Sequence, residues 1–468
     1  MNRLLIVLWV GVIVSIGGCT LSPKYTRPEA PIPEGWPIGA AYQETTAMPG
    51  APTATEIQWW DFFTDRRLQG VIEKALKNNR DLRLAALNVQ RARAMYGIQR
   101  AELFPSVNAV GSGSKQRVPA DLSATNKEMT AEQYRVNLGI SSWEIDFFGR
   151  IRSLKERALE EYLATEQARR SAQILLISAV ANAYLTLAAD REHLKLATAT
   201  LETQESAYNL IRRRYEVGLA SELDLRQAQT QMDAARGDIA RFTQVVAQDE
   251  NALTLVVGAS VPPGLSPTYL GSVSTPRQIF PGISSEVLLR RPDILAVEHR
   301  LKAANANIGA ARATFFPRIS LTTAVGTASS ELSGLFKSGS GTWSFAPQIV
   351  MPIFDARLWS AYDATKVEKE IALAQYEKAI QTAFREVADA LAARVPVETQ
   401  LLAQQSLVNA LAETRRLSNV RYTKGIDSYL GVLDAQRSLY AAEQGLITVR
   451  LARLASLVRL YTVLGGGA

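Results

Sequence analysis

The side chains that most often carry enzyme chemistry are few and scattered in this 468-residue chain. His193 and His299 are the only histidines, and neither lies at a spacing typical of metal ligands. The segment 111–114 reads Gly-Ser-Gly-Ser, but it lacks the lysine of a phosphate-binding loop and has strand character. No nucleophile, histidine and acid follow one another in an order typical of a catalytic triad. The sequence therefore predicts a protein that is not an enzyme and uses no metal ion or cofactor.

The first 18 residues have the composition of a secretory signal. Arg3 gives a basic start, an apolar run follows over residues 4–16, and two glycines stand before a cleavage position. The run is shorter than the roughly 20 apolar residues that a membrane-spanning helix needs. We therefore expect residues 1–18 to be a signal peptide.

The only cysteine, Cys19, follows this signal directly. A single cysteine excludes an intramolecular disulfide and most zinc sites. The segment 16–19 (Ile-Gly-Gly-Cys) resembles a bacterial lipobox, which implies that Cys19 is lipidated as the first residue of the mature chain. Thr20, and not an aspartate, follows it, which by resemblance to lipoprotein sorting rules favours the outer membrane.

The charge balance is basic but evenly distributed. The chain has a formal net charge of +7 and a pI of about 9.4. Excess Lys and Arg favour anionic partners such as lipid headgroups or nucleic acid. Here the basic residues are interspersed with acids and form no block, so a solvated surface of mixed charge is the better interpretation.

Two halves of the chain repeat one another. The pattern Arg-Tyr-x-x-Gly-x-x-Ser-x-Leu occurs at 214–223 and again 207 residues later at 421–430. The pattern Arg-Ala-x-x-Phe-Pro occurs at 100–105 and at 312–317. Solenoid units are only roughly 20–50 residues long. The repeat therefore predicts a duplicated half-domain, and pseudo-symmetric halves usually build a shared pore, ring or cleft.

The first half contains two expected strands between helices. A helical pattern over 65–104 stops at Pro105, strands are expected at 107–116 and 133–147, and the polar loop 117–132 joins them. The second strand alternates apolar and small or polar residues.

Two helices complete the first half. A helix over 149–217 could reach about 100 Å at ~1.5 Å per residue, and another runs to Val257. Small apolar residues spaced by three or four along the longer helix favour close coiled packing. Proline-rich residues 258–284 form an irregular connection.

The second half repeats this order. Helices are expected at 285–315, 356–423 and 428–464, with Pro396 bending or breaking the long one, and 329–342 is a Gly/Ser loop between two strands. Each strand places apolar residues on one face: Ile319, Leu321, Thr323 and Val325 in the first, and Phe345, Ile349, Met351 and Ile353 in the second.

Four strands of about ten residues suit a tilted membrane strand. Four strands cannot close a barrel, which needs about eight, and lipid does not tolerate open sheet edges. Three copies would supply twelve strands. The alternative is a soluble α+β protein with two hairpins packed on helices. We expect no helical inner-membrane protein, because no apolar stretch of roughly 20 residues follows the signal.

The chain resembles the outer-membrane efflux channels of the TolC superfamily, in the lipidated OprM-like branch. The resemblance covers essentially the whole mature chain and rests on these residues: the lipobox at 16–19, Asn-Arg-Asp-Leu at 79–82, Trp-Glu-Ile-Asp-Phe-Phe-Gly-Arg at 143–150, Arg-Arg-Pro-Asp-Ile at 290–294, Phe-Phe-Pro at 315–317 and Leu-Asp-Ala-Gln at 433–436.

The resemblance implies an α+β membrane protein that forms a homotrimer with a twelve-stranded barrel in outer-membrane lipid, a helical periplasmic tunnel and a mixed equatorial domain. It also implies a passive duct of a tripartite pump, with a periplasmic adaptor and an inner-membrane transporter of the resistance-nodulation-division type. We expect a signal at 1–18, a lipidated tether and start of the equatorial domain at 19–64, half-repeats at 65–258 and 285–468, and an equatorial connection at 259–284. The strand-to-strand loops then lie outside the cell.

The repeated turns are implied to form the periplasmic tip. Gly218 and Gly425 suit a tight interhelical turn with φ > 0, and Ser221 and Ser428 stand as N-caps of the following helices. Such tip turns are where family members meet the adaptor. Tyr215 and Tyr422 are expected to make inter-helix contacts at the tip.

The resemblance also implies a periplasmic gate. Asp434 matches an aspartate that constricts the entrance, and Leu430, four residues earlier on one helix face, matches an apolar constriction. Threefold symmetry would gather three carboxylates into a cation-selective ring. Gln227 stands at the equivalent position of the first half, and Gly431 stands where some family members carry a further acid.

Two other functions remain open at this point. One is the outer-membrane duct of a type I secretion system, against which the lipobox and OprM-like motifs argue. The other belongs to a different class: a periplasmic coiled-coil scaffold that transports nothing, or a nucleic-acid binder if residues 1–18 are no signal. As an export duct the protein binds no nucleic acid.

Overall fold

The structure is a computed structural model, and the residues that it describes are 20–42, 57–124, 126–277, 279 and 284–466. The described residues belong to two units. Unit 1 takes its residues from 1–29, 88–166 and 296–376, and unit 2 takes its residues from 30–87, 167–295 and 377–468. The limits between the units fall inside four of the helices.

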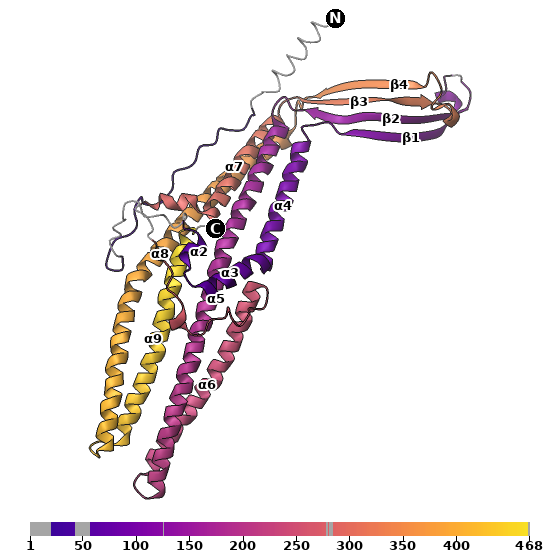
Figure 1. Ribbon diagram of the computed structural model, residues 1–468. Helices are drawn as coiled ribbons and strands as arrows, with labels where there is room; N and C mark the ends of the chain where they lie inside the picture. Colours follow the sequence, from indigo (N-terminus) through magenta and orange to yellow (C-terminus); the bar gives the residue numbers. More distant parts are fainter. Residues whose placement is uncertain (1–19, 43–56, 125, 278, 280–283, 467–468) are drawn as a thin grey trace. The chain divides into compact units, whose positions relative to one another are not determined.

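Unit 1 contains one antiparallel sheet in the order β1-β2-β3-β4 (Figure 1). The strands are β1 (Val107–Val118), β2 (Met129–Ile145), β3 (Arg318–Ser329) and β4 (Gly341–Val350). All four expected strands are confirmed, and each of them extends further into its connecting loop than expected. The last strand ends at Val350, because the chain turns away there, so the expectation that Met351 and Ile353 belong to it is wrong.

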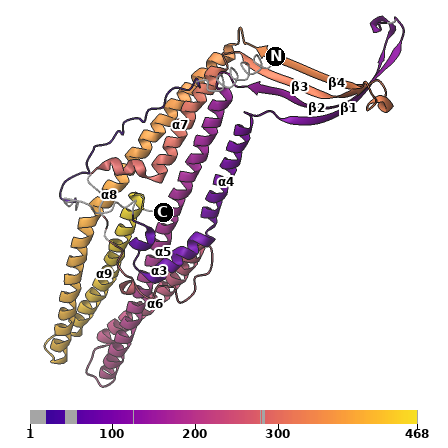
Figure 2. The same ribbon diagram turned by 45° about the horizontal axis from the view of Figure 1, so that its top comes forward.

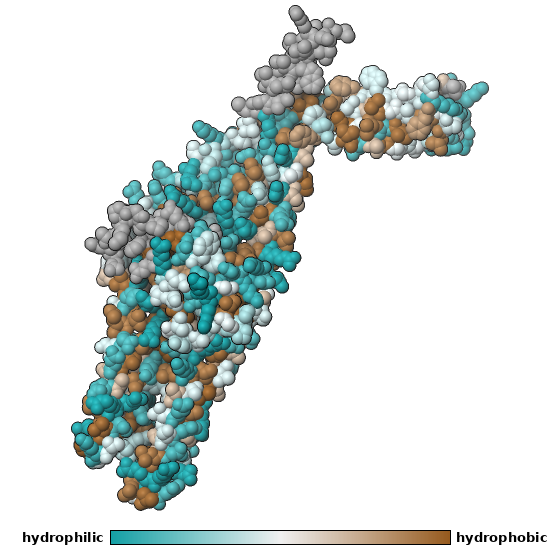
Figure 3. All heavy atoms as spheres, viewed as in Figure 1, coloured by the Kyte–Doolittle hydropathy of each residue, from teal (hydrophilic) through white to brown (hydrophobic). Residues whose placement is uncertain are grey.

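One face of this sheet is apolar along β2, β3 and β4. The register places Leu138 opposite Val325 and Ile319 opposite Ile349, so apolar side chains of neighbouring strands lie together. Trp343 remains 80% exposed on this face, and hydrophobic residues gather along the sheet in Figure 3. An exposed apolar face of this kind suits contact with lipid.

A bulge in β2 keeps the apolar side chains near the C-terminal end of this strand on the same face of the sheet. The pairing with β3 shifts between Ile140 and Trp143, and Ser142 has a left-handed φ of +53°. Because side chains alternate between the two faces, an unbroken strand would turn Trp143 away from the apolar side. The extra residue restores Trp143 to it, opposite Leu321.

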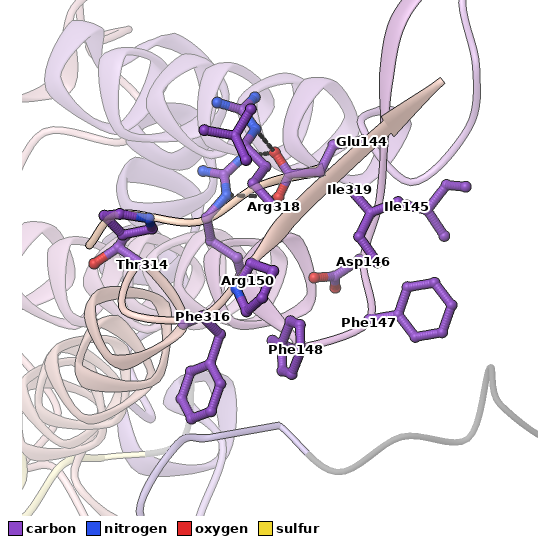
Figure 4. Close-up of a pocket in the computed structure, with 14 residues that line it drawn as sticks. Glu144, Ile145, Asp146, Phe147, Phe148, Arg150, Thr314, Phe316, Arg318 and Ile319 are labelled. Atoms are coloured by element: carbon purple, nitrogen blue, oxygen red, sulfur yellow. Dashed lines mark hydrogen bonds and ion pairs between the residues drawn. The ribbon is translucent and has the colours of Figure 1, made fainter. Parts of the chain in front are cut away.

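The sheet passes into helix α5 (Arg150–Glu216) through a charged junction (Figure 4). Glu144 receives two hydrogen bonds of 2.8 Å from Arg150 and one ion pair of 2.5 Å from Arg318. The rings of Phe148 and Phe316 stack with centroids 4.9 Å apart. These groups line a cavity of about 270 Å³. The junction is therefore fixed by both charge and packing.

Long helices form most of the rest of the chain. In Figure 2 the two helices that each repeated turn joins lie side by side. The long helices are α4 (Arg80–Ala101), α5, α6 (Glu222–Val257), α7 (Pro292–Ala313), α8 (Ala356–Thr423) and α9 (Tyr429–Val463). The short elements are α2 (Trp59–Phe62), α3 (Arg66–Asn78), η1 (Ala120–Leu122), η2 (Leu270–Ser272), η3 (Ser285–Arg290) and η4 (Leu332–Gly334).

Unit 2 has its own aromatic core. Phe62 of α2 stacks on Tyr461 of α9 with centroids 4.2 Å apart, and Phe63 meets the same ring edge-on. All three side chains are almost fully buried. Arg291 donates a hydrogen bond of 2.6 Å to the carbonyl of Val463 and so ties the end of α9 to the same unit.

Two expectations about the helices are wrong, and one alternative of a third is excluded. The single helix expected at 65–104 is broken at Asn79, whose side chain caps α4 by accepting from the Leu82 amide at 2.8 Å. The helix expected at 285–315 begins as the 3-10 segment η3. Of the bend or break expected at Pro396, the break is excluded, because this residue lies inside the continuous helix α8.

By length and composition, one helix of the described chain, α5, could cross a membrane. The expectation that no apolar stretch of roughly 20 residues follows the signal is therefore wrong by this measure. Of its most apolar 18-residue window, 56% is buried inside the protein. Burial accounts for this composition, because the core helix of a folded unit needs apolar side chains as much as a spanning helix does.

Candidate functional site: the two repeated hairpin turns

The first repeated turn joins α5 to α6. Gly218 has a φ of +76°, its amide donates to the Tyr215 carbonyl at 2.9 Å, and the Leu219 amide donates to the Arg214 carbonyl at 2.7 Å. These two bonds form a Schellman ending, in which a left-handed residue satisfies the last carbonyls of a helix. Glycine adopts this φ without steric cost.

The second repeated turn, between α8 and α9, has the same geometry. Gly425 has a φ of +70°, its amide donates to the Tyr422 carbonyl at 2.9 Å, and the Ile426 amide donates to the Arg421 carbonyl at 3.0 Å. The sequence repeat is thus a repeat of backbone structure. We call residues 217–221 and 424–428 the tip turns.

The two helices that leave the tip turns begin differently. Ser221 is the N-cap of α6, and its hydroxyl accepts from the Asp224 amide in a full capping box. Ser428 is the N-cap of α9, but its side chain makes no capping bond. The position equivalent to Asp224 is Gly431, which has no side chain that could reciprocate.

The two hairpins pack against each other next to the tip turns. The buried residues of this contact are Ile211, Ala228, Tyr429, Val432 and Leu433, and Tyr208, Ala220, Leu225 and Tyr422 pack around them. These side chains come from all four helices or their turns, so the contact holds both hairpins together. We call this set the tip core.

Tyr422 and Tyr215 have different surroundings, although they occupy equivalent positions. The Tyr422 hydroxyl accepts from Arg214 Nη1 at 2.9 Å, and its ring lies 5.2 Å from that of Tyr429. Tyr215 is 41% exposed and makes no side-chain hydrogen bond within the described chain. The structure therefore brings Tyr422 into the contact between hairpins and leaves Tyr215 at the surface.

Leu430 and Asp434 lie together on an exposed face of α9, away from its residues in the tip core. Leu430 is 58% exposed and Asp434 is also exposed. Tyr429, which precedes Leu430, and Leu433, which precedes Asp434, are buried. Asp434 makes no hydrogen bond or ion pair with any described residue. An apolar and an acidic side chain one helical turn apart are thus free to face other molecules or other copies of the chain.

An exposed ion pair spans the second tip turn. Arg421 binds both carboxylate oxygens of Asp427 at 2.5 and 3.0 Å. The hydrogen bonds from Arg421 hold the pKa of Asp427 below its usual value, so this carboxylate stays charged near neutral pH. Beside it, burial raises the pKa of Tyr429 to about 12, so this phenol stays neutral.

Cys19 lies outside the described residues, but the chain is described from Thr20 onward. The sequence predicted a tether within residues 19–64 but not the contacts that residues 20–27 make with α7. It also missed the bond from Arg214 to Tyr422. No local signal marks either contact, because each joins positions far apart in the sequence.

Comparison with known proteins agrees with this fold. The model of the family "outer membrane efflux protein" matches residues 71–259 and 283–466. The toluene efflux pump outer membrane protein TtgC and the antibiotic efflux pump outer membrane protein ArpC, both of Pseudomonas putida, are each 52% identical over 453 residues. These matches cover 97% of this chain and 93% of each relative.

A solved structure shows the same architecture. The open state of the MtrE outer membrane channel of Neisseria gonorrhoeae matches with a TM-score of 0.87 and 38% identity, and covers 96% of this chain and 98% of MtrE. The chain therefore belongs to the outer membrane efflux protein family. It is a TolC-superfamily channel of the Gram-negative outer membrane, a transport duct and not an enzyme.

Membership of this family explains how the two edge strands of the sheet find partners. Within the described chain, β1 and β4 each pair on one side only. In a trimer, three four-stranded sheets form a closed barrel, and the long helices form the tunnel. The alternative of a soluble α+β protein with two hairpins packed on helices is thereby excluded.

Proposed function

We propose that this protein is the passive exit duct of a tripartite multidrug efflux pump. It carries drugs and other amphiphilic compounds from the periplasm to the outside. Two relatives at 52% identity support this range of cargo, since TtgC is named for toluene efflux and ArpC for antibiotic efflux. A duct supplies no energy, so the pump needs an inner-membrane transporter, which we infer to be of the resistance-nodulation-division type.

The observation that carries the proposal of a gate is the exposed pair Leu430 and Asp434. The tip core fixes the buried face of α9, so its free face presents this pair in a defined orientation. In a trimer three such pairs would surround one axis, with an apolar ring one helical turn from a ring of carboxylates. Such a ring favours cations and narrows the entrance.

Opening this gate requires a change in the contact between hairpins. The bond from Arg214 to Tyr422 and the tip core hold α9 against the first hairpin. The similar MtrE channel has been solved in an open state. We infer that engagement with the adaptor and transporter shifts this chain from a closed to an open entrance.

The tip turns are the proposed docking sites for the periplasmic adaptor. They contain Gly218, Ser221, Gly425 and Ser428, and they expose apolar side chains: Val217 and Leu219 are each 69% exposed, and Ile426 is 58% exposed. Apolar side chains at exposed turns suit burial against a partner. Changing Leu219 and Ile426 to Asp should abolish resistance while trimers still form. Retained resistance would argue against docking at the tip turns.

We also propose that Cys19 carries a covalent lipid that anchors the chain in outer-membrane lipid. The lipobox-like segment before it supports this. Radiolabelled palmitate should enter the wild-type protein and not a Cys19→Ser variant. Equal labelling of both would remove Cys19 as the acylated residue.

Drug susceptibility tests the function as a whole. A strain that lacks this gene should become more sensitive to several antibiotics and to toluene, and the wild-type gene should restore resistance. If the deletion changed no susceptibility but blocked release of a secreted protein, the chain would serve a type I secretion system instead.

A further inference from the structure

Residues 20–27 lie along one face of α7 as an extended segment, which we call the strap. The Leu21 carbonyl accepts a hydrogen bond from Arg312 Nη1 at 3.3 Å, and the Pro23 carbonyl accepts one from Asn305 Nδ2 at 2.7 Å. The strap and both donors belong to unit 1. A free tether would satisfy its carbonyls with water, so these bonds indicate a docked segment.

The far end of the strap is held by the buried carboxylate of Glu298. The Tyr25 hydroxyl donates to Oε1 at 3.2 Å, and Arg27 binds both carboxylate oxygens. Lys302, one turn along α7, lies 3.2 Å from the same Oε1. Although burial acts to raise it, the hydrogen bonds from Arg27 and Lys302 hold the pKa of Glu298 below its usual value. We call these four residues the clasp.

The clasp explains why a carboxylate can be buried here. Glu298 is only 2% exposed, and a buried charge is costly unless it is paired and hydrogen-bonded. Two of its three partners, Tyr25 and Arg27, come from the strap. Without the strap, Glu298 would keep only Lys302.

The strap and the helix match in length. From Glu298 to Arg312 the helix advances 14 residues, about 21 Å at ~1.5 Å per residue. From Arg27 to Leu21 the strap advances six residues in the opposite direction, about 20–22 Å for a fully extended chain. An extended strap of this length therefore suffices to run along this part of α7.

The strap approaches α7 most closely at Gly309. A Cβ atom at this position would lie 2.0 Å from Ser22 Oγ and 2.6 Å from the Ser22 amide nitrogen. The Ser22 hydroxyl also lies 3.2 Å from the hydroxyl of Ser153 in α5, which is fully buried, and 3.3 Å from the Ala306 carbonyl in α7. Only glycine leaves room for the strap to join both helices.

The strap ends where the sheet becomes helix. A Cβ atom on Gly149 would lie 3.0 Å from the Thr20 Cα atom. Gly149 directly precedes α5, and the neighbouring Phe147 is 46% exposed. Exposed aromatic side chains at the end of membrane strands mark the level of the lipid headgroups. Thr20 therefore lies at the rim of the sheet.

We propose that the strap, held by the clasp and by the close approach at Gly309, fixes the point of lipid attachment at the rim of the sheet. Because Thr20 directly follows Cys19 in the chain, the lipid is then attached one residue from this rim, and the strap links α5 to α7. This rests on the proposed lipidation of Cys19, but docking of the strap requires no lipid.

Two glycine substitutions test the close approach. Gly309→Ala places a methyl group against the Ser22 backbone, whereas nothing lies within 4 Å of a Cβ at Gly97, the equivalent helical position of the first half. Both substitutions favour the helix equally. Lys24 lies exposed in the strap, so tryptic cleavage after it reports release of the strap.

We expect purified trimers with Gly309→Ala to be cleaved roughly tenfold faster after Lys24 than wild type, because overpacking displaces the strap. Gly97→Ala should match wild type. Equal cleavage of all three proteins would overturn the proposal.

A disulfide tests docking without lipid. Ser22→Cys with Ser153→Cys is introduced into a Cys19→Ser chain that is exported through a signal peptide for unlipidated proteins. The two hydroxyl oxygens lie 3.2 Å apart, and the periplasm is oxidising, so we expect a disulfide in folded trimers. Adding Gly309→Ala should suppress it. Trimers without the disulfide would refute docking, whereas failed palmitate labelling of Cys19 would refute lipidation alone.

Discussion

Asp224 and Gly431 occupy the third position of α6 and α9, 207 residues apart, and only Asp224 closes a capping box. The Asp224 amide donates to Ser221 Oγ at 3.1 Å, and the Ser221 amide donates to Asp224 Oδ2 at 3.2 Å. At the second turn Ser428 has no such partner. The tip turns thus share a backbone conformation, but only the first turn has a side-chain cap on the helix that follows it.

This difference predicts unequal effects of one substitution at two equivalent positions. Ser221→Ala should destabilise the start of α6 by about 1 kcal/mol, because a capping hydroxyl is lost. Ser428→Ala should change little. Amide hydrogen exchange at the first turns of α6 and α9 measures both. Equal acceleration at the two turns would contradict the assigned caps.

A second matched pair tests the bond between the hairpins. Tyr422→Phe keeps the ring in the tip core but removes the acceptor for Arg214, so the free energy of unfolding should fall by roughly 0.5–1.5 kcal/mol. Tyr215→Phe should have no effect, because the Tyr215 hydroxyl has no partner within the described chain. Thermal unfolding of detergent-solubilised trimers distinguishes the two, and equal melting temperatures for both variants would count against the bond.

The hairpin of α5 and α6 should become less stable as pH rises. Burial and the neighbouring Asp249 carboxyl raise the pKa of Asp190 from its ordinary 3.8 to about 6. Between about pH 4 and pH 6 the folded chain therefore holds a proton at Asp190 that the unfolded chain has released. Stability from this site is fully present below about pH 4 and is lost as pH rises towards about 6.

Asp190→Asn should remove this slope and raise the melting temperature at pH 7. The control is Asp233→Asn, since Asp233 is an exposed acid of α6 in a surface ion pair with Arg236. Unfolding of trimers between pH 4 and pH 7 measures the slope. A wild-type slope in the Asp190→Asn variant would show that Asp190 is not its source.

The strands and the repeat could be predicted because their signals are local. Alternation placed Leu321 and Val325 on one face, and glycine at 218 and 425 marked both turns. The break at Asn79 was missed although Asn-Arg-Asp carries a capping signal. The long helical pattern on both sides hid it. The Asn79 side chain also donates to the Val256 carbonyl at 2.7 Å. This contact with a distant helix leaves no local pattern in the sequence.

The site itself was only partly predictable. Periodicity put Leu430 and Asp434 on one helix face, but which face packs depends on the tip core, which joins residues more than 200 positions apart. The strap was also hidden, because its proline-rich composition is typical of a tether. Nothing local in the sequence distinguishes Glu298 from other helix glutamates, because its partners Tyr25 and Arg27 lie 273 and 271 positions away.

The central claim is that Leu430 and Asp434 narrow the duct at its periplasmic entrance. Single-channel recording in planar bilayers tests it most directly, with Leu430→Ala plus Asp434→Ala against the matched control Leu223→Ala plus Gln227→Ala. We predict a larger conductance and a weaker cation preference for the first variant only. Unchanged conductance, or an equal increase in the control, would contradict the account.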